Sequence, residues 1–557
     1  MKKQILYIFF FFFALFIASC GISKSMRHQP EIAAYNNIKP VVQKQSDTIF
    51  YTRNNFLLRN KQHLWELYAE GDPLERGLAI GSLTDSLLKK QEHILFDKVN
   101  ELIPSDFKRS ILRNFLKWFN RKLYLNVDNE FQTEIYGVSQ YAPKDLSYIA
   151  PSFLRDLYLH GAHDIGHAVQ DLAMVGCTSF AVWGNKSDDG SLILGRNFDF
   201  YAGDDFAKEK IIAFINPKDG HPFMMVTWPG MIGVCSGMNA EGLTVTINAG
   251  KSKIPLIAKT PISIVTREIL QYAKTIDEAI AIAKKRKVFV SESIMVGSAN
   301  DNKAVLIEIA PDNLDIFEAP NGNELICSNH FQSEALKDNK RNLNQIKNSH
   351  SQYRFDRMTE LLNENQKITP QIAVDILRNK DGINNVSLGY GNEKAINQLL
   401  AHHGIVFKPA QRLVWVSASP YQLGEFVCYD LNAIFKNKKE NTASFVSLEN
   451  ETMNIPPDPF LKSAAYQNYI QFRIEDKKMD AVLSNKTNLP SGNYIGYYQS
   501  LNPDYWVVYY KAGLYFYRNK KYDLAQDQFE KALTKEVTSL IEREKISSYL
   551  KKIKRKR

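Results

Sequence analysis

Residues 174–200 have the sequence MVGCTSFAVWGNKSDDGSLILGRNFDF, and this stretch decides the expected fold. Two short runs within it, 178–183 and 191–198, are rich in apolar, β-branched and aromatic residues. The polar segment NKSDDG between them has the composition of a tight turn. This pattern predicts two antiparallel strands joined as a hairpin.

The predicted hairpin brings together residues that are distant in the sequence. Antiparallel pairing places Cys177 opposite residues 197–199, so that Arg196 and Asp199 flank the cysteine. A nearby arginine favours the nucleophilic thiolate, and an aspartate can hold a nearby ammonium group. A buried cysteine beside a structural arginine–aspartate pair fits the hairpin equally well, so the hairpin alone does not decide the chemistry.

The residues around this hairpin predict a mixed domain over 177–440. Strand-like runs broken by Gly, Asn and Asp alternate there with helical segments near 261–286, 351–363 and 370–379. Such interleaving is typical of a layered α+β or α/β domain. The preceding segment, 61–176, carries apolar residues at helical spacing and is expected to be helical.

The N-terminus has the features of an export signal, expected over residues 1–20. Two lysines precede the apolar stretch Ile5–Ile17, whose thirteen residues are fewer than the roughly 20 needed to span a bilayer. The segment Ile17-Ala18-Ser19-Cys20 resembles the lipobox of bacterial lipoproteins, which implies that Cys20 is acylated as a membrane anchor. The alternative is an ordinary cleaved signal with an incidental cysteine. We therefore expect an exported lipoprotein of the cell envelope, on the periplasmic side or the cell surface, with 21–60 as a polar tether.

The C-terminal region, 441–557, is expected to be helical. Its stretch 509–533 resembles one tetratricopeptide helix–turn–helix, spanning about 504–536, with 463–484 as a candidate degenerate partner. The small and aromatic residues that carry this resemblance are Gly513, Tyr517, Tyr522, Ala525, Phe529 and Ala532. A lone repeat cannot bury its own apolar face, which favours packing on the main body over recognition of a protein partner.

The formal net charge of +10 does not indicate nucleic-acid binding. The tail KKIKRKR contributes six positive charges and Lys2 and Lys3 two more, so 10 − 8 leaves about two for the body. A nearly balanced body has no basic stripe, and an exported chain rarely meets nucleic acid. The tail is most simply a solvated end that is free to lie on anionic lipid.

Neither the cysteines nor the histidines predict a metal centre, and no cofactor is expected. Cys177, Cys235, Cys327 and Cys428 lie far apart without a CxxC pair, so the last three are expected as small buried apolar residues, with a disulfide as the alternative. The segment HGAHDIGH, 160–167, spaces its histidines at i, i+3 and i+7, but no HExxH is present. A packed or orienting role is favoured over a metal-binding face.

Several stretches resemble the N-terminal nucleophile amidases. The residues CTS followed by GRNFDF are similar to acid ceramidase and its N-acylethanolamine-cleaving relatives, to the choloylglycine hydrolases and, most closely, to the acyl-CoA:6-aminopenicillanic acid (isopenicillin N) acyltransferases. Four further stretches agree in order with the acyltransferases: EGDPLERGLAIG (70–81), GMNAEGLTVTINAG (237–250), ELICSNHFQ (324–332) and YRFDRM (353–358). Matches in order along much of the chain are more specific than any single motif.

The resemblance implies a four-layer αββα sandwich and a precursor that cuts its own Gly176–Cys177 bond. Cys177 then supplies both the thiol nucleophile and, through its new α-amino group, the base. The resemblance assigns roles to five further residues. Asp199 would hold the amino group, Arg196 would bias the thiol toward thiolate, Asn248 and Asn329 would bind the oxyanion, and Arg354 would complete the site, with Arg357 and Arg412 as alternatives.

The sequence therefore predicts a cysteine amidohydrolase or acyltransferase acting at a C–N amide bond through a Cys177 thioester. Hydrolysis is favoured because water is always available outside the cytoplasm, whereas acyl-CoA is not. The substrate is left open between an N-acylated amino acid or lipid, a β-lactam side chain and a conjugated steroid. The alternative is a non-catalytic surface lipoprotein whose C-terminal repeat binds a partner.

Overall fold

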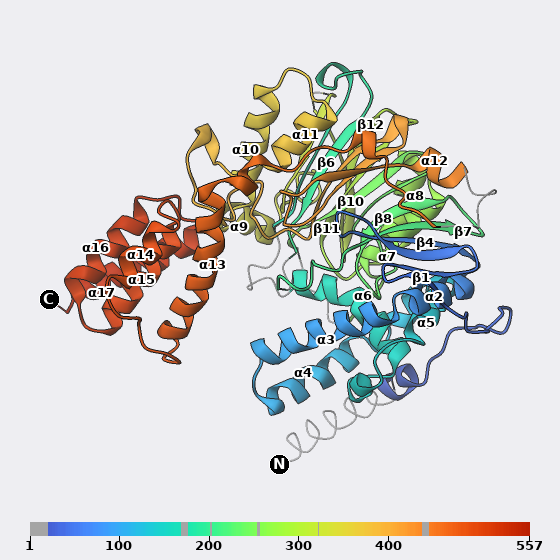
Figure 1. Ribbon diagram of the computed structural model, residues 1–557, viewed down its shortest axis with the longest axis horizontal. Helices are drawn as coiled ribbons and strands as arrows, with labels where there is room; N and C mark the ends of the chain where they lie inside the picture. Colours follow the sequence, from blue (N-terminus) through green and yellow to red (C-terminus); the bar gives the residue numbers. More distant parts are fainter. Residues whose placement is uncertain are drawn as a thin grey trace, which may run out of the picture.

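The computed structural model describes residues 21–168, 176–200, 203–252, 257–320, 322–436 and 445–556. Figure 1 shows the sheets and their covering helices in one body, with the C-terminal helices grouped to one side of it. Within these ranges no helix is both long and apolar enough to cross a membrane. The expected signal and Cys20 lie outside the described residues.

The larger sheet has eleven strands in the described part of the chain, in the order β1-β2-β3-β4-β7-β8-β9-β10-β11-β12-β13. The strands are β1 (Gln43–Ser46), β2 (Ile49–Thr52), β3 (Asn55–Arg59), β4 (Trp65–Gly71), β7 (Ile211–Pro217), β8 (Phe223–Thr227), β9 (Ser236–Asn239), β10 (Leu243–Ala249), β11 (Glu292–Ser298), β12 (Lys303–Ala310) and β13 (Asn313–Glu318). Neighbours pair antiparallel except β4 and β7, which run parallel from Trp65↔Ile211 to Gly71↔Pro217.

The expected tether, 21–60, and part of the expected helical segment are therefore wrong. Strands β1 to β3 occupy 43–59 and β4 follows, so the N-terminal chain builds one side of the larger sheet. The reason is local. The sequence TIFYTRNNFLLRN, 48–60, forms a hairpin rich in β-branched and aromatic residues, and its Leu57 and Leu58 are buried. Because the residues on either side of it are polar, the segment as a whole has the composition of a tether.

The smaller sheet contains the predicted hairpin and has the described strand order β14-β5-β6-β15-β16-β17. Its strands are β5 (Thr178–Val182), β6 (Ile193–Phe198), β14 (Glu324–Cys327), β15 (His403–Lys408), β16 (Leu413–Ser417) and β17 (Phe426–Asp430). β5 and β6 pair antiparallel from Thr178↔Asn197 to Val182↔Ile193, which is the register expected from the turn. The strand signals of β9, β13 and β15 were not identified in the sequence.

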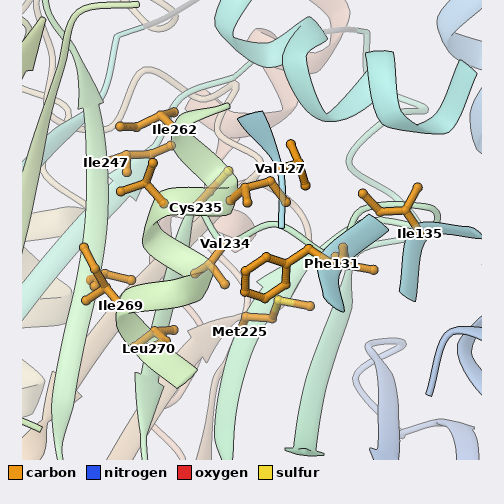
Figure 2. Packing of buried hydrophobic residues seen from close by; sticks show 14 of the residues in the cluster. Val127, Phe131, Ile135, Met225, Val234, Cys235, Ile247, Ile262, Ile269 and Leu270 are labelled. Atoms are coloured by element: carbon orange, nitrogen blue, oxygen red, sulfur yellow. The ribbon is translucent and has the colours of Figure 1, made fainter. Parts of the chain in front are cut away.

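Three apolar clusters hold the sheets and helices together. One lies between the sheets, where residues of the smaller sheet such as Leu194 pack with residues of the larger sheet such as Phe214. A second joins the other face of the larger sheet to helices α5 (Asn129–Ser139), α6 (Ser152–Ala168), α7 (Ile262–Tyr272) and α8 (Ile276–Lys285), and Figure 2 shows Phe131 and Ile247 among its members. The third joins the other face of the smaller sheet to α10 (Ser351–Glu364) and α11 (Pro370–Leu377).

The segment EGDPLERGLAIG has a structural role at the start of α2 (Pro73–Leu83). The Asp72 side chain accepts a hydrogen bond from the Glu75 N–H and caps the helix, whose first residue is proline. Gly77 then allows α2 to approach α5, because a Cβ at that position would lie 2.2 Å from the Glu134 carbonyl oxygen. Glu134 of α5 pairs with Arg76 of α2 and with Arg267 of α7 in a buried cluster.

The remaining helices of the main body are α3 (Asp85–Leu102), α4 (Asp106–Phe119), α9 (Lys340–Asn348) and α12 (Leu431–Lys436). The C-terminal helices are α13 (Ala464–Leu483), α14 (Tyr494–Ser500), α15 (Trp506–Arg518), α16 (Tyr522–Leu533) and α17 (Leu540–Lys554). A helix pair is present where a repeat was expected, with Gly513 of α15 against the Phe529 ring of α16. The candidate partner at 463–484 is instead one continuous helix, α13, because its apolar residues continue without a turn signal.

Candidate active site

Cys177 lies directly before β5 and is fully buried. Because β5 pairs with β6 in the register above, Arg196 and Asp199 come close to the cysteine. The Arg196 Nη2 atom is 3.6 Å from the Cys177 Sγ atom. The structure therefore brings together the three residues that the hairpin predicted to be neighbours.

Arg196 is oriented by the larger sheet. Its Nη1 atom donates to the Cys235 carbonyl oxygen at 2.7 Å and to the Ser236 hydroxyl, and its Nη2 atom donates to the Ile247 carbonyl oxygen. Its guanidinium also lies over the Phe198 ring, 4.3 Å from the centroid. Because these acceptors are fixed, the guanidinium is held in one orientation, in which its Nη2 atom points at the cysteine sulfur.

Burial raises the pKa of the Cys177 thiol, although Arg196 and Arg354 act in the opposite direction. Arg196 therefore lowers the pKa of the thiol as expected, but burial raises that pKa by more. In the unbroken chain the sulfur is consequently held as a thiol rather than a thiolate at neutral pH. Reaction at this sulfur requires a nearby group that takes the thiol proton.

Asp199 is a candidate for proton exchange. Burial raises the pKa of its carboxyl group to about 7, while Arg354, Arg196 and the Gln422 side chain lower it. Neither carboxyl oxygen accepts a hydrogen bond of good geometry from the described part of the chain. A buried carboxyl group with this pKa can accept or release a proton near neutral pH.

The two predicted asparagines lie beside the cysteine strand. Asn248, on β10, donates to the Cys327 carbonyl oxygen at 3.1 Å and to the Ser328 carbonyl oxygen at 3.3 Å. Its Oδ1 atom accepts from the Ser179 hydroxyl at 3.1 Å. Asn329 follows β14 and donates to the Ala249 carbonyl oxygen at 3.1 Å. Both amides are buried and fixed, and in the unbroken chain both bind backbone carbonyls.

Arg354 is the arginine that reaches the site. Its Nη1 atom donates to the Cys177 carbonyl oxygen at 2.6 Å, and its Nη2 atom donates to Asn329 Oδ1 at 2.7 Å. Burial lowers the pKa of Arg354 to about 10, and Asp199 and Cys177 counteract that effect. One guanidinium thus connects the cysteine backbone to a predicted oxyanion donor.

The two alternative arginines lie elsewhere. Arg357 binds Glu360 at 2.6 Å and Asn385 Oδ1 at 2.6 Å. Arg412 donates to the carbonyl oxygens of Ala240 at 2.8 Å and Pro409 at 2.6 Å. Neither forms a hydrogen bond with Cys177 among those that the structure describes, so Arg354 is the one of the three arginines that binds the cysteine residue here.

Two further polar residues near the site, His403 and Gln398, could not be predicted from the sequence. His403 Nε2 lies 2.9 Å from the Ser236 hydroxyl, which in turn binds Arg196. His403 begins β15, and the apolar run HGIVFK was the available signal for that strand. Gln398 Nε2 donates to the Gly176 carbonyl oxygen at 2.8 Å, and no local motif marks this glutamine.

His160, the first histidine of the segment 160–167, is packed in the interior. His160 is buried, its Nδ1 atom lies 2.8 Å from the Asp156 carbonyl oxygen, and its Nε2 atom accepts from the Ile232 N–H at 3.0 Å. Burial lowers its pKa to about 4, so the ring is neutral. The side chains of the other two histidines lie outside the described residues. Among the side chains that are described, no group of three or more candidate ligands is arranged around a metal position.

An apolar cavity of about 160 Å³ lies close to the site, between α3, α6 and residues 228–231. Its walls include Phe200 and Trp228, which stack with each other and with Phe198. Phe198 in turn lies under the Arg196 guanidinium. The cavity wall is therefore connected to the cysteine through Phe198 and Arg196.

Parts of this sequence are similar to known proteins. Residues 184–420 match the sequence model of the acyl-coenzyme A:6-aminopenicillanic acid acyl-transferase family. An uncharacterized protein of Archaeoglobus fulgidus is 24% identical over 271 residues, which are 46% of this chain and 45% of that protein. Protein dcd1B of Dictyostelium discoideum is 24% identical over 304 residues, 50% of this chain and 57% of that protein. The chain spans about half the length of these curated relatives.

Two solved structures also resemble parts of the chain. The Caenorhabditis elegans ortholog of N-acylethanolamine-hydrolyzing acid amidase is 18% identical with a TM-score of 0.31, covering 42% of this chain and 93% of that one. A variant of conjugated bile acid hydrolase from Clostridium perfringens is 13% identical with a TM-score of 0.32, covering 48% of this chain and 95% of that one. The family match begins after Cys177, so the role of the cysteine rests on geometry. Over residues 184–420 the match confirms the resemblance to the acyl-CoA:6-aminopenicillanic acid acyltransferases of the N-terminal nucleophile superfamily.

Proposed function

We propose that this protein is an N-terminal cysteine enzyme that hydrolyses a C–N amide bond or transfers its acyl group to an amine. The observation that carries the proposal is the approach of Arg196 Nη2 to within 3.6 Å of the Cys177 sulfur, with Asp199 on the same strand end. The family match supports acyl chemistry at amide bonds. The four-layer αββα arrangement of that superfamily is part of the same proposal.

Activation begins with cleavage of the Gly176–Cys177 bond. The Cys177 sulfur attacks the Gly176 carbonyl carbon, and the thiol proton passes to the Cys177 backbone nitrogen, with Asp199 as the candidate carrier. The C–N bond breaks, which leaves a Gly176 thioester on sulfur and a free α-amino group. Water then hydrolyses the thioester, releasing the Gly176 carboxylate and restoring the thiol.

The new α-amino group serves as the base in turnover. Its unperturbed pKa of about 8 allows it to take the thiol proton as the sulfur attacks a substrate carbonyl, and to return that proton to the leaving amine. The resulting thioester is then attacked by water or by an acceptor amine. Asp199, once beside an ammonium group, has its pKa lowered and becomes the counter-ion that holds the terminus.

Stabilisation of the tetrahedral oxyanion is assigned to Asn248 and Asn329. The longer of the Asn248 contacts, at 3.3 Å to the Ser328 carbonyl oxygen, is the one that must open to free an N–H for substrate. Arg354 fixes Asn329 through its Oδ1 atom. A donor in such a site contributes on the order of 3 kcal/mol to transition-state stabilisation.

The apolar cavity is the proposed site for the acyl group. Its walls include Leu88, Leu95, Val99 and Trp228, which favour an apolar acyl chain or a ring system over a charged one. Phe198 and Arg196 stand between the cavity wall and the sulfur, so an acyl group that fills the cavity presents its carbonyl to Cys177 only when one of these side chains moves aside. Hydrolysis is proposed over transfer to an amine, since water needs no second binding site.

Mass analysis of the purified folded protein tests this function. We expect two polypeptides separated at Gly176–Cys177 in the wild type and one uncut polypeptide in Cys177→Ala. A thiol-reactive acyl-amide analogue should add its acyl mass to Cys177 of the wild type alone. An uncut wild-type chain that acquires no adduct at Cys177 would refute the enzyme and favour a scaffold.

We also propose that Cys20 anchors the mature protein to the envelope membrane, as its lipobox-like sequence suggests. The same mass spectrum then contains an N-terminal polypeptide that begins at Cys20 and carries acyl chains. Cys20→Ser should be recovered in the aqueous phase after detergent partition, whereas the wild type should enter the detergent phase. Recovery of both proteins in the aqueous phase would contradict the anchor.

A further inference from the structure

The carbonyl group that self-cleavage must attack already has a hydrogen-bond donor. Gln398 Nε2 donates to the Gly176 carbonyl oxygen at 2.8 Å, and the Gln398 side chain is 2% exposed. The predicted oxyanion donors are engaged elsewhere, since Asn329 binds the Ala249 carbonyl oxygen and Asn248 binds the carbonyl oxygens of Cys327 and Ser328. The glutamine is thus positioned for a different carbonyl from theirs.

The residue before the cysteine is fitted to this donor. A Cβ atom at position 176 would lie 2.5 Å from Gln398 Nε2 and 2.9 Å from Gln398 Oε1. A larger residue at position 176 would therefore displace the Gln398 amide from its present place against the carbonyl. The Gly176 N–H donates to the Asp199 carbonyl oxygen at 3.2 Å, so the nitrogen and the carbonyl oxygen of Gly176 are both held by hydrogen bonds.

The loop that carries Gln398 is held from two sides. Asn197, which pairs with Thr178 across the hairpin, donates to the Ile396 carbonyl oxygen at 2.9 Å. On the other side, Tyr469 of α13 donates through its hydroxyl to the Leu399 carbonyl oxygen at 3.3 Å. The cysteine hairpin and the C-terminal helices therefore fix the loop together, and a fixed donor loses little entropy when charge develops on its acceptor.

We infer that Gln398 is a catalytic residue of self-cleavage, donating its amide N–H to the oxyanion that forms on Gly176. The inference rests on the proposed function. The sulfur–carbon bond forms as the carbonyl double-bond electrons move to oxygen, where the Gln398 N–H holds them. The carbonyl is restored as the C–N bond breaks and the thiol proton reaches the departing nitrogen, so Gln398 gives up no proton of its own.

The test is the rate of chain cleavage in pulse-labelled full-length protein. Gln398→Met retains the length of the side chain but has no donor, and we expect it to cleave on the order of 100-fold more slowly than the wild type. The matched control is Gln271→Met, because Gln271 is a buried glutamine that binds Glu130 and the Asp219 carbonyl oxygen rather than the site. It should cleave at the wild-type rate.

Gln398→Glu separates the chemical role from folding. An ionised glutamate cannot donate, but a protonated one can, so the cleavage rate of this variant relative to wild type should rise as the pH falls from 8 to 5. A relative rate that does not change with pH, or wild-type cleavage by Gln398→Met, would overturn the inference. If the wild type is never cut, the proposed function itself is wrong. If the wild type and both Gln398 variants are cut at the same rate, the proposed function stands and only the inference about Gln398 is wrong.

Discussion

Arg354 donates to the Cys177 carbonyl oxygen at 2.6 Å, while Arg357, one turn further along α10, binds Glu360 and Asn385. The two arginines are equally buried and share one sequence motif. They differ in what they bind, since Arg354 reaches the residue before the cysteine strand and Arg357 binds within its own helix and the following loop. This difference supplies a matched pair of variants for the site.

Arg354→Lys is expected to lower kcat/KM for amide hydrolysis by roughly 100-fold, because lysine lacks the planar fork whose two nitrogens bind the Cys177 carbonyl oxygen and Asn329 Oδ1 separately. Arg357→Lys should retain activity within about threefold and lose only stability. Steady-state kinetics on the cleaved enzymes measure both. Equal losses in the two variants would contradict the assignment of Arg354.

Asp199 predicts a pH-dependent stability that can be isolated in a Cys177→Ala background, where the chain stays uncut. Because burial raises the carboxyl pKa from 3.8 to about 7, the folded state binds more protons than the unfolded state between those values, and stability falls as the pH rises through that window. Asp199→Asn removes this ionisation. The variant should therefore gain on the order of 3 kcal/mol relative to its parent between pH 5 and pH 8.

Denaturant unfolding of parent and variant at both pH values measures that difference, and other titrating groups cancel in the comparison. Two stability curves that stay parallel from pH 5 to pH 8 would exclude a raised pKa at Asp199.

Arg196 is expected to control the reactivity of the sulfur. Arg196→Lys preserves the charge but cannot reach the Cys235 and Ile247 carbonyl oxygens together, so its position near Cys177 is lost. Alkylation of Cys177 by iodoacetamide at pH 7 should slow at least tenfold, and stability should fall by about 2 kcal/mol. Arg357→Lys again serves as the control. An unchanged alkylation rate would mean that Arg196 has no effect on the thiol.

Substitution of Gly77 is expected to disturb the packing of α2 against α5, away from the candidate site. Gly77→Ala places a Cβ atom 2.2 Å from the Glu134 carbonyl oxygen and should lower the free energy of unfolding by about 2 kcal/mol. Gly161→Ala is the matched helical control, because its Cβ atom would meet the Phe289 ring at an ordinary 3.4 Å. Higher helix propensity should leave that variant as stable as wild type or more so. Thermal unfolding distinguishes them, and similar midpoints would contradict close α2–α5 packing as the reason for the glycine.

The hairpin of β5 and β6 could be predicted because all the information was local. Turn composition and strand length together fix a register from Thr178↔Asn197 to Val182↔Ile193. Strands β1 to β4 could not be placed in this way. β4 completes its pairing with β7, whose sequence lies far beyond it, as in Glu66↔Ile212, and no local pattern specifies a partner at that distance.

The candidate site divides in the same manner. The hairpin placed Arg196 and Asp199 beside the cysteine, and the family motifs added Asn248 and Asn329. Helical spacing could not choose between Arg354 and Arg357, because the orientation of α10 depends on its packing against the smaller sheet. No sequence motif marks Gln398 as a site residue. It lies in an irregular loop 222 positions from Gly176, and only the folded chain brings the two together.

The parallel pairing of β4 with β7 determines what a cut at Gly176–Cys177 would do to the molecule. β4 precedes the cut and β7 follows it, yet seven consecutive residue pairs join them within one continuous sheet. A single nick would therefore release no fragment. The two polypeptides would migrate as one particle in native solution and separate only when the protein is denatured.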